Sequence, residues 1–418
     1  MKYGLIGEHL GHSYSREIHA QVADYDYELC EVAPEELDSF LRKAEFRAIN
    51  VTIPYKQSVI PYLSYISPQA ESIGAVNTVV NRDGKLWGYN TDFAGMEALI
   101  ARMGLSLRGK KVLILGTGGT SKTARAVCES AGAREILKVS RRASGEAVSY
   151  EQAVSGHGDA EILINTTPVG MYPRCGEAPI DLAHFPRLEG VVDAVYNPLR
   201  TRLVQAGQER GVPAEGGLYM LAGQGVCASA IFLGKEFDPA LTEGVYRAIL
   251  GRKQNIVLIG MPSCGKTTVG RWVARRLKRP FRDTDKLIVR RAGKSIPEIF
   301  AEKGETGFRQ MEAEIVAEVA RESGVVIATG GGSALNPESV RRLKQNGRIY
   351  FLDRPLEQLC PTGDRPLSSN ADALRKRYEE RYPLYNAVCD QRIPAEGTIE
   401  ENVELVLNAA DFGKRTAR

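Results

Sequence analysis

Residues 260–267 read G-M-P-S-C-G-K-T and match the phosphate-binding pattern G-x-x-x-x-G-K-[S/T]. The surrounding sequence predicts an apolar strand over 255–259 and a helix over 268–277, which is the context that the pattern requires. In such a loop, backbone N–H groups surround the phosphates, Lys266 reaches the β- and γ-phosphate oxygens, and Thr267 ligates Mg²⁺. The C-terminal part of the chain is therefore expected to fold as a parallel α/β domain that binds a nucleotide. The expected nucleotide contacts are Ser263, Cys264, Gly265, Lys266, Thr267 and Thr268.

A second glycine loop lies earlier, at residues 116–119. An apolar strand over 110–115 precedes it, and a helix over 121–131 and a strand over 135–140 follow, an order that predicts a parallel sheet. Glycines in this place let the backbone approach the pyrophosphate of a dinucleotide. Ser121 takes the place of the third glycine of G-x-G-x-x-G, so a tight turn without a ligand stays open as the alternative. The expected cofactor contacts are Gly116, Thr117, Gly118, Gly119 and Thr120.

The second strand of this block ends in Ser140-Arg141-Arg142. Enzymes that use NAD usually carry Asp or Glu there, to bind the ribose hydroxyls. Two guanidinium groups are instead suited to a 2′-phosphate, which predicts NADP(H) as the cofactor. A solvated pair of charges at a strand end is the alternative interpretation.

Four clusters of short polar side chains follow apolar runs in the first 95 residues. They are 12–15 (H-S-Y-S), 50–56 (N-V-T-I-P-Y-K), 74–78 (G-A-V-N-T) and 88–92 (G-Y-N-T-D). Sheet proteins place ligands at the ends of such runs. Each cluster alone is more typical of a turn or a cap, but together, with a lysine and an aspartate, they predict a site for a polyhydroxylated substrate with an acid–base pair.

Length and composition agree with several soluble domains. The 418 residues allow between two and four domains of roughly 150 residues. Glycine is in excess, since 42 of the residues are glycine against a usual share of roughly 7%. A net charge of +4 gives no reason to expect a nucleic-acid or acidic-membrane partner. The absence of a signal peptide, of a long apolar run and of any C-x-x-C pair among the seven cysteines predicts a cytoplasmic protein with reduced cysteines. The predicted partners are small-molecule substrates.

The predicted organisation follows from these blocks. It comprises a substrate-binding α/β domain over 1–95, an NADP-binding Rossmann domain over 96–250, and a P-loop domain with a parallel sheet over 255–418. The polar residues 251–254 are interpreted as the linker between the last two domains. The helices at about 226–250 are expected to pack back onto the first domain.

The polar clusters occur in one order with I-N-T-T-P-V-G-M (164–171) and M-L-x-x-Q-G (220–225). In this order they make the first 250 residues resemble shikimate dehydrogenase, which reduces 3-dehydroshikimate to shikimate with NADPH. The resemblance implies that Lys56 and Asp92 form the catalytic pair, with the ammonium group stabilising and then protonating the alkoxide. It also implies a cofactor contact from Gly217. The implied substrate contacts are Ser13, Ser15, Thr52, Asn77, Asp92, Tyr196 and Gln224.

This sequence departs from the dehydrogenase pattern at two places. Arg16 stands where the family usually has proline, directly after the S-x-S pair. The triplet Ser140-Arg141-Arg142 replaces the family's Asn-Arg-Thr or Asn-Arg-Ser. The second departure leaves room for an altered cofactor preference.

Charged residues downstream of the 260–267 loop suggest a second chemistry. Asp283 and Asp285 are two positions apart, so on an extended segment both face the same way. One of them could serve a metal ion and the other a substrate hydroxyl. Arg309 and Arg381 are suited to bind a carboxylate bidentately, with a surface ion pair as the alternative for each.

The motifs G-E-x-x-F-R-x-x-E (304–312), A-T-G-G-G (328–332), D-R-P-L (364–367) and R-Y-P-L-Y (381–385) make residues 255 to about 410 resemble shikimate kinase. The resemblance implies that Asp285 contacts the shikimate hydroxyl and acts as its base, while Thr267 and Asp283 hold Mg²⁺. It implies that Arg365 closes from a lid onto the ATP phosphates. The lid segment is short here and lacks a basic residue that many relatives carry. The implied contacts to the acid are Arg309, Arg381, Gly330, Gly331 and Gly332.

Together the two resemblances predict a bifunctional enzyme of aromatic amino-acid biosynthesis. The product of the first reaction, shikimate, is the substrate of the second, which gives shikimate 3-phosphate. One alternative is a dehydrogenase that uses quinate as well as shikimate. The other is that one half is retained as a non-catalytic binding module.

Overall fold

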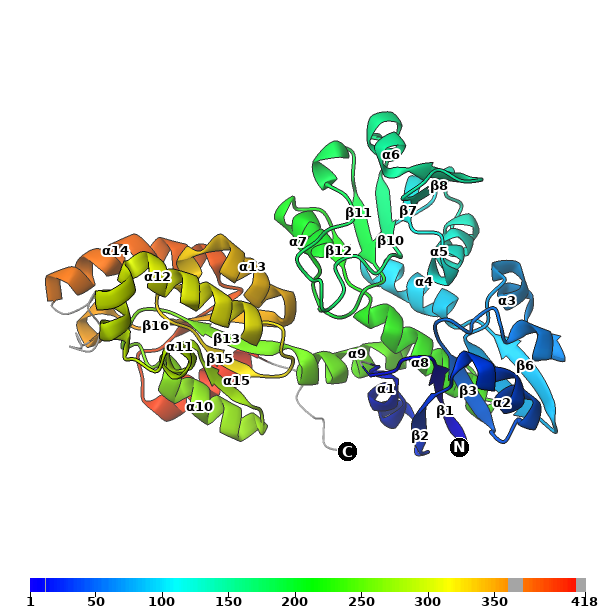
Figure 1. The fold of residues 1–418 in the computed structure, drawn as a ribbon, viewed down its shortest axis with the longest axis horizontal. Coiled ribbons are helices and arrows are strands. Elements are labelled where there is room, and N and C mark those ends of the chain that lie inside the picture. The colour runs from blue at the N-terminus through cyan, green and yellow to red at the C-terminus, as the bar shows by residue number, and fades with distance from the viewer. Residues whose placement is uncertain (12, 360–370, 411–418) are drawn as a thin grey trace. The chain divides into compact units, whose positions relative to one another are not determined.

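The computed structural model describes residues 1–11, 13–359 and 371–410. The chain divides into two compact units, Met1–Ile249 and Leu250–Arg418, called here the N-terminal and the C-terminal unit. Sheets flanked by helices make up both units (Figure 1), which confirms the predicted α/β class. Among the described residues, no helix is both long enough and apolar enough to cross a membrane.

The first sheet of the N-terminal unit is mixed, with the strand order β2-β1-β3-β5-β6-β4. Its strands are β1 (Tyr3–Gly7), β2 (Tyr27–Glu31), β3 (Ala48–Val51), β4 (Tyr65–Ile66), β5 (Thr78–Arg82) and β6 (Lys85–Tyr89). The helices beside it are α1 (Ser15–Val22), α2 (Leu37–Lys43) and α3 (Pro68–Ile73), with short turns η1 (Pro34–Glu36) and η2 (Ile60–Tyr62). β5 and β6 form an antiparallel hairpin whose turn residues Asp83 and Gly84 both have positive φ, 52° and 81°. Two positive φ values match the right-handed twist of the paired strands.

The second sheet of this unit is entirely parallel, in the order β12-β11-β10-β7-β8-β9. Its strands are β7 (Lys111–Leu115), β8 (Glu135–Ser140), β9 (Ala147–Ser149), β10 (Ile162–Asn165), β11 (Gly190–Asp193) and β12 (Ala214–Glu215). The helices are α4 (Asp92–Arg102), α5 (Gly119–Ser130), α6 (Tyr150–Gly156) and α7 (Arg202–Glu209), with the turn η3 (Leu182–His184). Every residue of the central strand β7 is buried, as a parallel sheet covered on both faces requires.

Helix α8 (Leu218–Leu233) joins the two sheets of the N-terminal unit. It packs against α4 on one side and against α1 on the other. Ten of its sixteen residues are buried, and they include the polar Gln224 and Ser229. α8 therefore carries polar side chains into the space between the two sheets.

The sheet of the C-terminal unit is parallel throughout, in the order β14-β15-β13-β16-β17. Its strands are β13 (Asn255–Ile259), β14 (Phe281–Asp283), β15 (Val326–Ala328), β16 (Gly347–Asp353) and β17 (Gln391–Pro394). The helices are α10 (Lys266–Leu277), α11 (Thr284–Ala292), α12 (Ile296–Val319), α13 (Pro337–Asn346), α14 (Ala371–Val388) and α15 (Ile399–Ala409), with turns η4 (Ser333–Leu335) and η5 (Leu356–Gln358). β13 is central and wholly buried, so the glycine loop after it starts from the rigid middle of the sheet.

The predicted linker at 251–254 is wrong in its local structure. Helix α9 (Ala240–Lys253) continues through Arg252 and Lys253, which form its last turn, and only Gln254 separates it from β13. Cations in a last turn are favoured by the helix dipole, so a polar end of a helix and a loop look alike in sequence. Inside the C-terminal unit, Arg279 donates to the carbonyls of Gly251 and Gln254, the latter over 2.9 Å. The Gly324 N–H donates to the Lys253 carbonyl over 2.8 Å.

Candidate active sites

The two residues predicted to form an acid–base pair, Lys56 and Asp92, meet in the N-terminal unit. Lys56 is in the loop after β3, and its carbonyl accepts a hydrogen bond from the Val76 N–H over 2.8 Å. Asp92 is the first residue of α4, where a helix N-terminus favours negative charge. Lys56 Nζ donates to Asp92 Oδ2 over 2.5 Å, and the side chains are 18% and 11% exposed. The ammonium group is thus held in place and still open to a ligand, as a proton donor must be.

Asn77, Thr91 and Gln224 form a buried hydrogen-bonded group that adjoins Asp92 in the chain. Asn77 Oδ1 accepts from the Thr91 N–H over 2.8 Å, and Asn77 Nδ2 donates to Thr91 Oγ1 over 3.1 Å. Thr91 Oγ1 donates to Gln224 Oε1 over 3.5 Å. Because Gln224 comes from α8, the packing of α8 against α4 brings two of the predicted substrate residues together.

Asn50, a residue of β3 without a predicted role, supports this group. Its Nδ2 donates to Thr78 Oγ1 over 3.0 Å and to the Asn77 carbonyl over 3.2 Å, and its Oδ1 accepts from the Tyr27 hydroxyl over 2.8 Å. Burial raises the pKa of Tyr27 well above its ordinary value, so the hydroxyl stays a donor. Asn50 is the first residue of the N-V-T-x-P-x-K motif, and this place in the motif was the sequence signal that could have identified its role.

The remaining predicted substrate residues come from three segments. Ser15 is buried at the start of α1, and its N–H donates to Ser13 Oγ over 3.2 Å. Thr52 follows β3, and its N–H donates to the Ile6 carbonyl over 2.9 Å. Tyr196 follows β11, and its ring lies 5.3 Å from that of Tyr14, centroid to centroid. The Ser13–Ser15 segment and Tyr196 are therefore brought together by the fold. Arg16, in the place of the usual proline, is exposed in the first turn of α1.

The glycine loop after β7 leaves its backbone open. Gly116 has φ +110°, and a Cβ there would lie 2.7 Å from Thr166 Oγ1, so only glycine fits. A Cβ at Gly118 or Gly119 would meet nothing within 4 Å, which leaves room for a phosphate at the start of α5. Ser121, in the place of the third glycine, is buried and donates from its hydroxyl to the Gly118 carbonyl over 2.7 Å. The serine thus stabilises the turn that the missing glycine would have made.

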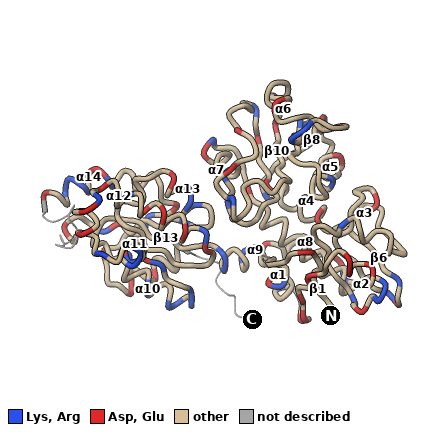
Figure 2. The backbone as a smooth tube through the Cα atoms, viewed as in Figure 1, with Lys and Arg blue, Asp and Glu red and all other residues tan. Residues whose placement is uncertain are grey.

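An open depression of about 500 Å³ lies beside this loop, lined by Thr117, Ser140, Arg141 and Arg142. Both arginines are exposed, and Figure 2 shows the Lys and Arg stretch at the end of β8. The Ser140 hydroxyl donates to the Arg142 carbonyl and fixes the turn that carries them. Two exposed guanidinium groups and a roomy depression fit the 2′-phosphate of NADP(H).

Two further residues that were predicted to contact the cofactor lie at the starts of helices. Thr120 is in the first turn of α5, next to the open glycines. Gly217 precedes α8, and a Cβ there would collide with the Ala194 carbonyl oxygen, so the chain can pass this close to β11 only as glycine.

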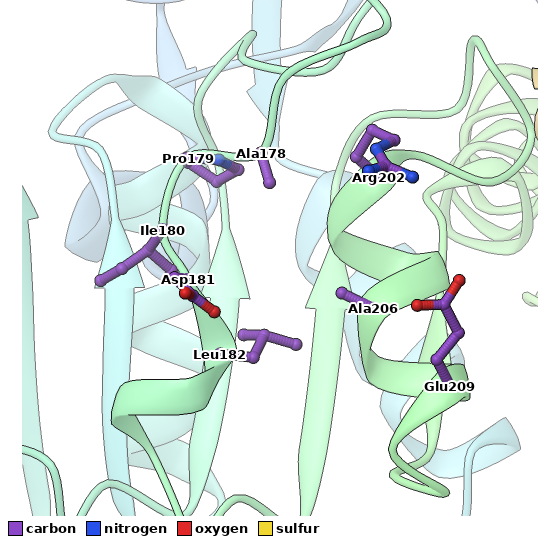
Figure 3. A pocket seen from close by; sticks show the side chains of 8 residues that line it. All are labelled: Ala178, Pro179, Ile180, Asp181, Leu182, Arg202, Ala206 and Glu209. Carbon is purple, nitrogen blue, oxygen red and sulfur yellow. The ribbon is translucent and has the colours of Figure 1, made fainter. Parts of the chain in front are cut away.

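A second depression of the same unit, about 440 Å³, contains none of the predicted site residues. Its lining comes from the segment Ala178–Leu182 on one side and from α7 on the other, as Figure 3 shows. Apolar side chains line it together with the charged Asp181, Arg202 and Glu209, of which the last two lie at opposite ends of α7. The acid–base pair and the glycine loop are formed by other elements.

The phosphate-binding loop of the C-terminal unit has the backbone that its motif requires. Gly260, Ser263 and Gly265 have positive φ values of 145°, 64° and 100°. Lys266 is buried, and its Nζ donates to the carbonyls of Gly260 (2.9 Å) and Met261 (2.8 Å). The ammonium group therefore lies inside the loop, where phosphate oxygens would replace these carbonyls.

The neighbours of Lys266 in this loop differ in exposure. Cys264 is 1% exposed, and its side chain packs in the core. Thr268 is exposed in the first turn of α10.

Thr267 and Asp283 meet at the end of β14, as predicted for a magnesium site. Thr267 Oγ1 donates to Asp283 Oδ2 over 2.8 Å. Asp283 also caps α11, since its Oδ1 accepts from the Lys286 N–H over 3.2 Å. A hydroxyl and a carboxylate are the hard oxygen ligands that Mg²⁺ prefers, so these residues fit the ion.

The residues predicted to bind the acid, called here the acid site, lie around the glycine loop after β15. Arg381 Nη1 donates to the Gly331 carbonyl over 2.9 Å, and the guanidinium of Arg309 lies where a Cβ of Gly332 would be. Asp285 Oδ1 lies 2.6 Å from the Cβ position of Gly330. The structure thus brings together all the residues predicted to hold the acid and its hydroxyl. Arg365, predicted to close onto the ATP phosphates, lies outside the described residues.

Three residues to which the sequence assigned no role support this site, and two of them, Glu312 and Tyr385, stand in the quoted motifs. Glu312 is 3% exposed and accepts from Arg309 Nη1 and from the Ser333 hydroxyl, each over 2.7 Å. The Tyr385 hydroxyl donates to the Gly331 carbonyl over 2.5 Å. These contacts hold the glycine loop and Arg309 in position.

Comparison with known proteins assigns each unit a family. Residues 5–79 match the shikimate dehydrogenase substrate binding domain, and residues 262–411 match shikimate kinase. A shikimate dehydrogenase (NADP(+)) of Clostridium beijerinckii is 36% identical over 261 residues, which cover 58% of this chain and 96% of that protein.

Solved structures of shikimate dehydrogenases are also similar to this chain. Shikimate dehydrogenase 1 of Peptoclostridium difficile has a TM-score of 0.55 at 33% identity, over 60% of this chain and 98% of that chain. Shikimate 5-dehydrogenase of Thermus thermophilus, in complex with NADP(H) and shikimate, has a TM-score of 0.54 at 30% identity, over 59% of this chain and 99% of that chain.

Proposed function

This chain belongs to the shikimate dehydrogenase family and carries a shikimate kinase domain at residues 262–411, and we propose on that basis that it catalyses two consecutive reactions. The N-terminal unit reduces 3-dehydroshikimate to shikimate with NADPH. The C-terminal unit transfers the γ-phosphoryl group of ATP to shikimate, as in aromatic amino-acid biosynthesis. The observation that carries the proposal is the presence in one chain of the Lys56–Asp92 pair and the Lys266–Thr267 phosphate loop, because the first product is the second substrate.

NADPH supplies the hydride for the first reaction. The open backbone at Gly118 and Gly119 would hold its diphosphate, and Arg141 and Arg142 its 2′-phosphate. Ser13, Ser15, Thr52, Asn77, Tyr196 and Gln224 would orient the keto acid.

Lys56 acts at the reacting carbonyl of that acid. As the carbonyl carbon gains the hydride, its oxygen becomes negative, and the Lys56 ammonium group stabilises this charge and then gives up a proton to form the alcohol. Asp92 accepts a hydrogen bond from Lys56 and so keeps its Nζ directed into the site.

The second reaction requires that the two substrates are positioned and that the negative charge on the phosphate oxygens is neutralised. Lys266 would bind the β- and γ-phosphates, while Thr267 and Asp283 would hold Mg²⁺. Asp285 accepts the proton of the shikimate hydroxyl as that oxygen attacks the γ-phosphorus, and the bond from this phosphorus to the ADP oxygen breaks. Arg309 and Arg381 bind the carboxylate of the acid.

A coupled assay tests the proposal. The purified chain is given 3-dehydroshikimate, NADPH and Mg-ATP, and both NADPH oxidation and shikimate 3-phosphate are followed. We expect both, with the phosphate ester dependent on NADPH when 3-dehydroshikimate is the starting acid. NADPH oxidation without the ester would refute the kinase half, and the ester formed only from added shikimate would refute the dehydrogenase half.

The cytoplasmic location of the protein stays a prediction.

A further inference from the structure

Helix α14 presents a row of side chains to the glycine loop after β15. The Tyr385 hydroxyl and, one turn earlier, Arg381 Nη1 both donate to the Gly331 carbonyl. Arg377 is one further turn earlier, and side chains four residues apart lie on the same face of a helix. Arg381 is buried and Arg377 half-buried, so the row runs from the core to the edge of the acid site.

Arg377 belongs to a cluster of three guanidinium groups. Arg309 lies against Gly332, and Arg381 Nη1 lies 3.4 Å from the Cβ position of Gly331, so both groups cover the same loop. Arg377 interacts electrostatically with both arginines. Arg377 therefore lies near one guanidinium group from α12 and one from α14, and Figure 2 shows both basic and acidic residues along α14.

The charges around Arg377 are mixed, because Glu312 is a buried partner of Arg309 and because Glu305 and Glu380 interact with Arg377. Burial, and next the positive charge of Arg381, lower the pKa of Arg377, although Glu305 and Glu380 act in the opposite direction. Glu305 is shared between Arg377 and Arg309, because it also accepts a hydrogen bond from Arg309 over 3.1 Å. Its side chain is 54% exposed. Like charges one turn apart on a helix repel, so a bound anion would relieve the repulsion between Arg377 and Arg381.

We propose that Arg377 is a third anion-binding residue of the acid site and acts with Arg309 and Arg381 on the carboxylate of the kinase substrate. The inference rests on the proposed kinase function of the C-terminal unit. It makes the acid site of this chain selective for a charged carboxylate over an uncharged ester, because three positive groups face it in place of two.

Steady-state kinetics of Arg377→Leu test the proposal, with shikimate and its methyl ester as paired phosphoryl acceptors. We expect the KM for shikimate to rise about tenfold, a loss typical of one charge-assisted hydrogen bond, with kcat and the KM for ATP within about twofold of wild type. The KM for the ester should not change. Arg377→Lys should retain most of the affinity. Arg375→Leu, at an exposed position of the same helix, is the matched control and should behave as wild type.

Each other outcome overturns the proposal. An unchanged KM for shikimate means that Arg377 does not bind the acid, and equal changes for acid and ester mean that it acts on shape and not on charge. A raised KM for ATP would assign it to the nucleotide. If Arg377→Leu does not fold, the polar and uncharged Arg377→Gln decides by the same ratio of acid to ester. Equilibrium dialysis with labelled shikimate separates the test of Arg377 from the test of the kinase function. A wild-type chain that binds shikimate without phosphorylating it refutes the kinase function. The effect of Arg377→Leu on that binding still tests whether the residue binds the acid.

Discussion

Lys56 Nζ and Asp92 Oδ2 lie 2.5 Å apart although 36 positions separate the two residues. The segment between them makes the approach possible. The Val76 N–H donates to the Lys56 carbonyl, and the Asn77 N–H donates to the Tyr89 carbonyl over 3.0 Å. The G-A-V-N-T segment thus holds the lysine loop on one side and the end of β6 on the other, and the pair is arranged before any substrate arrives.

Replacing Lys56 by alanine should abolish the reductase reaction and spare the kinase. Loss of the proton donor is expected to lower kcat by about 10²–10⁴-fold. Phosphorylation of added shikimate should stay at the wild-type rate, because Lys56 belongs to the other compact unit. Lys85→Ala, at an exposed lysine of β6, is the control. Near-normal NADPH oxidation in the Lys56 variant would contradict the assigned role.

Replacing Lys266 by methionine should have the opposite effect. The side chain keeps its length but loses the charge that would bind the phosphates, so we expect kinase kcat to fall by about 10²–10³-fold. NADPH oxidation should not change. Lys303→Met, at an exposed position of α12, controls for loss of a lysine as such. A variant that phosphorylates shikimate normally would show that Lys266 does not contact the transferred group.

The double variant Arg141→Gln with Arg142→Gln should change the choice of coenzyme. Loss of charged hydrogen bonds to the 2′-phosphate predicts a rise of about 10- to 100-fold in the KM for NADPH. The KM for NADH, which lacks this phosphate, should stay nearly constant. Arg187→Gln, at an exposed arginine of the same unit, is the control. Equal losses with both coenzymes would assign the arginines a structural role.

The buried imidazole of His19 should make the stability of the N-terminal unit depend on pH. It stacks on Tyr27 with ring centroids 3.9 Å apart, and its Nδ1 lies 2.6 Å from the Tyr25 hydroxyl oxygen. Burial lowers the pKa of His19 from 6.5 to about 3. Below pH 6.5 the unfolded chain therefore takes up a proton that the folded unit does not. Stability from this group is full above pH 6.5 and is lost towards pH 3, at up to about 1.4 kcal/mol per pH unit.

Urea unfolding can isolate this effect, because Trp87 and Trp272 are the only two tryptophans of the chain and each lies in a different unit. In a Trp272→Phe background, Trp87 fluorescence reports on the N-terminal unit. Asp193 opposes His19, since burial raises its pKa from 3.8 to about 6 and its contribution is lost as pH rises through that range. The informative quantity is thus the difference between wild type and His19→Gln, expected to change by about 2 kcal/mol between pH 7 and 5. The exposed His9, changed to Gln, should leave the pH dependence intact; the same curve for His19→Gln and wild type would disprove the assignment.

The sequence predicted the structure most accurately where one motif determines both the local backbone geometry and the chemistry of the site. The positive φ values of Gly260 and Gly265, the burial of Lys266 and the meeting of Thr267 with Asp283 all follow from one strand–loop–helix arrangement. The parallel sheets followed from the βαβ order. The polar cluster at 74–78 enters β5 only at Thr78, because residues 75–77 turn to meet the lysine loop.

The supporting residues could not be predicted because their partners are distant in the chain. Asn50 stands in a motif, but its role depends on Thr78, 28 positions away. Glu312 likewise depends on Ser333, 21 positions away. The third arginine of the acid site has no motif of its own and is recognised only from its place one turn before Arg381 on α14.

The continuation of α9 through Lys253 decides where this gene can be divided. The final turn of the helix supplies the carbonyls of Gly251 and Lys253 to Arg279 and to the Gly324 N–H. Arg279 is half-buried, so a truncated kinase that starts at Asn255 would remove two of its acceptors inside the fold. A free-standing kinase should therefore be expressed from a start codon placed before Leu250, and a protease site meant to release it belongs upstream of that residue.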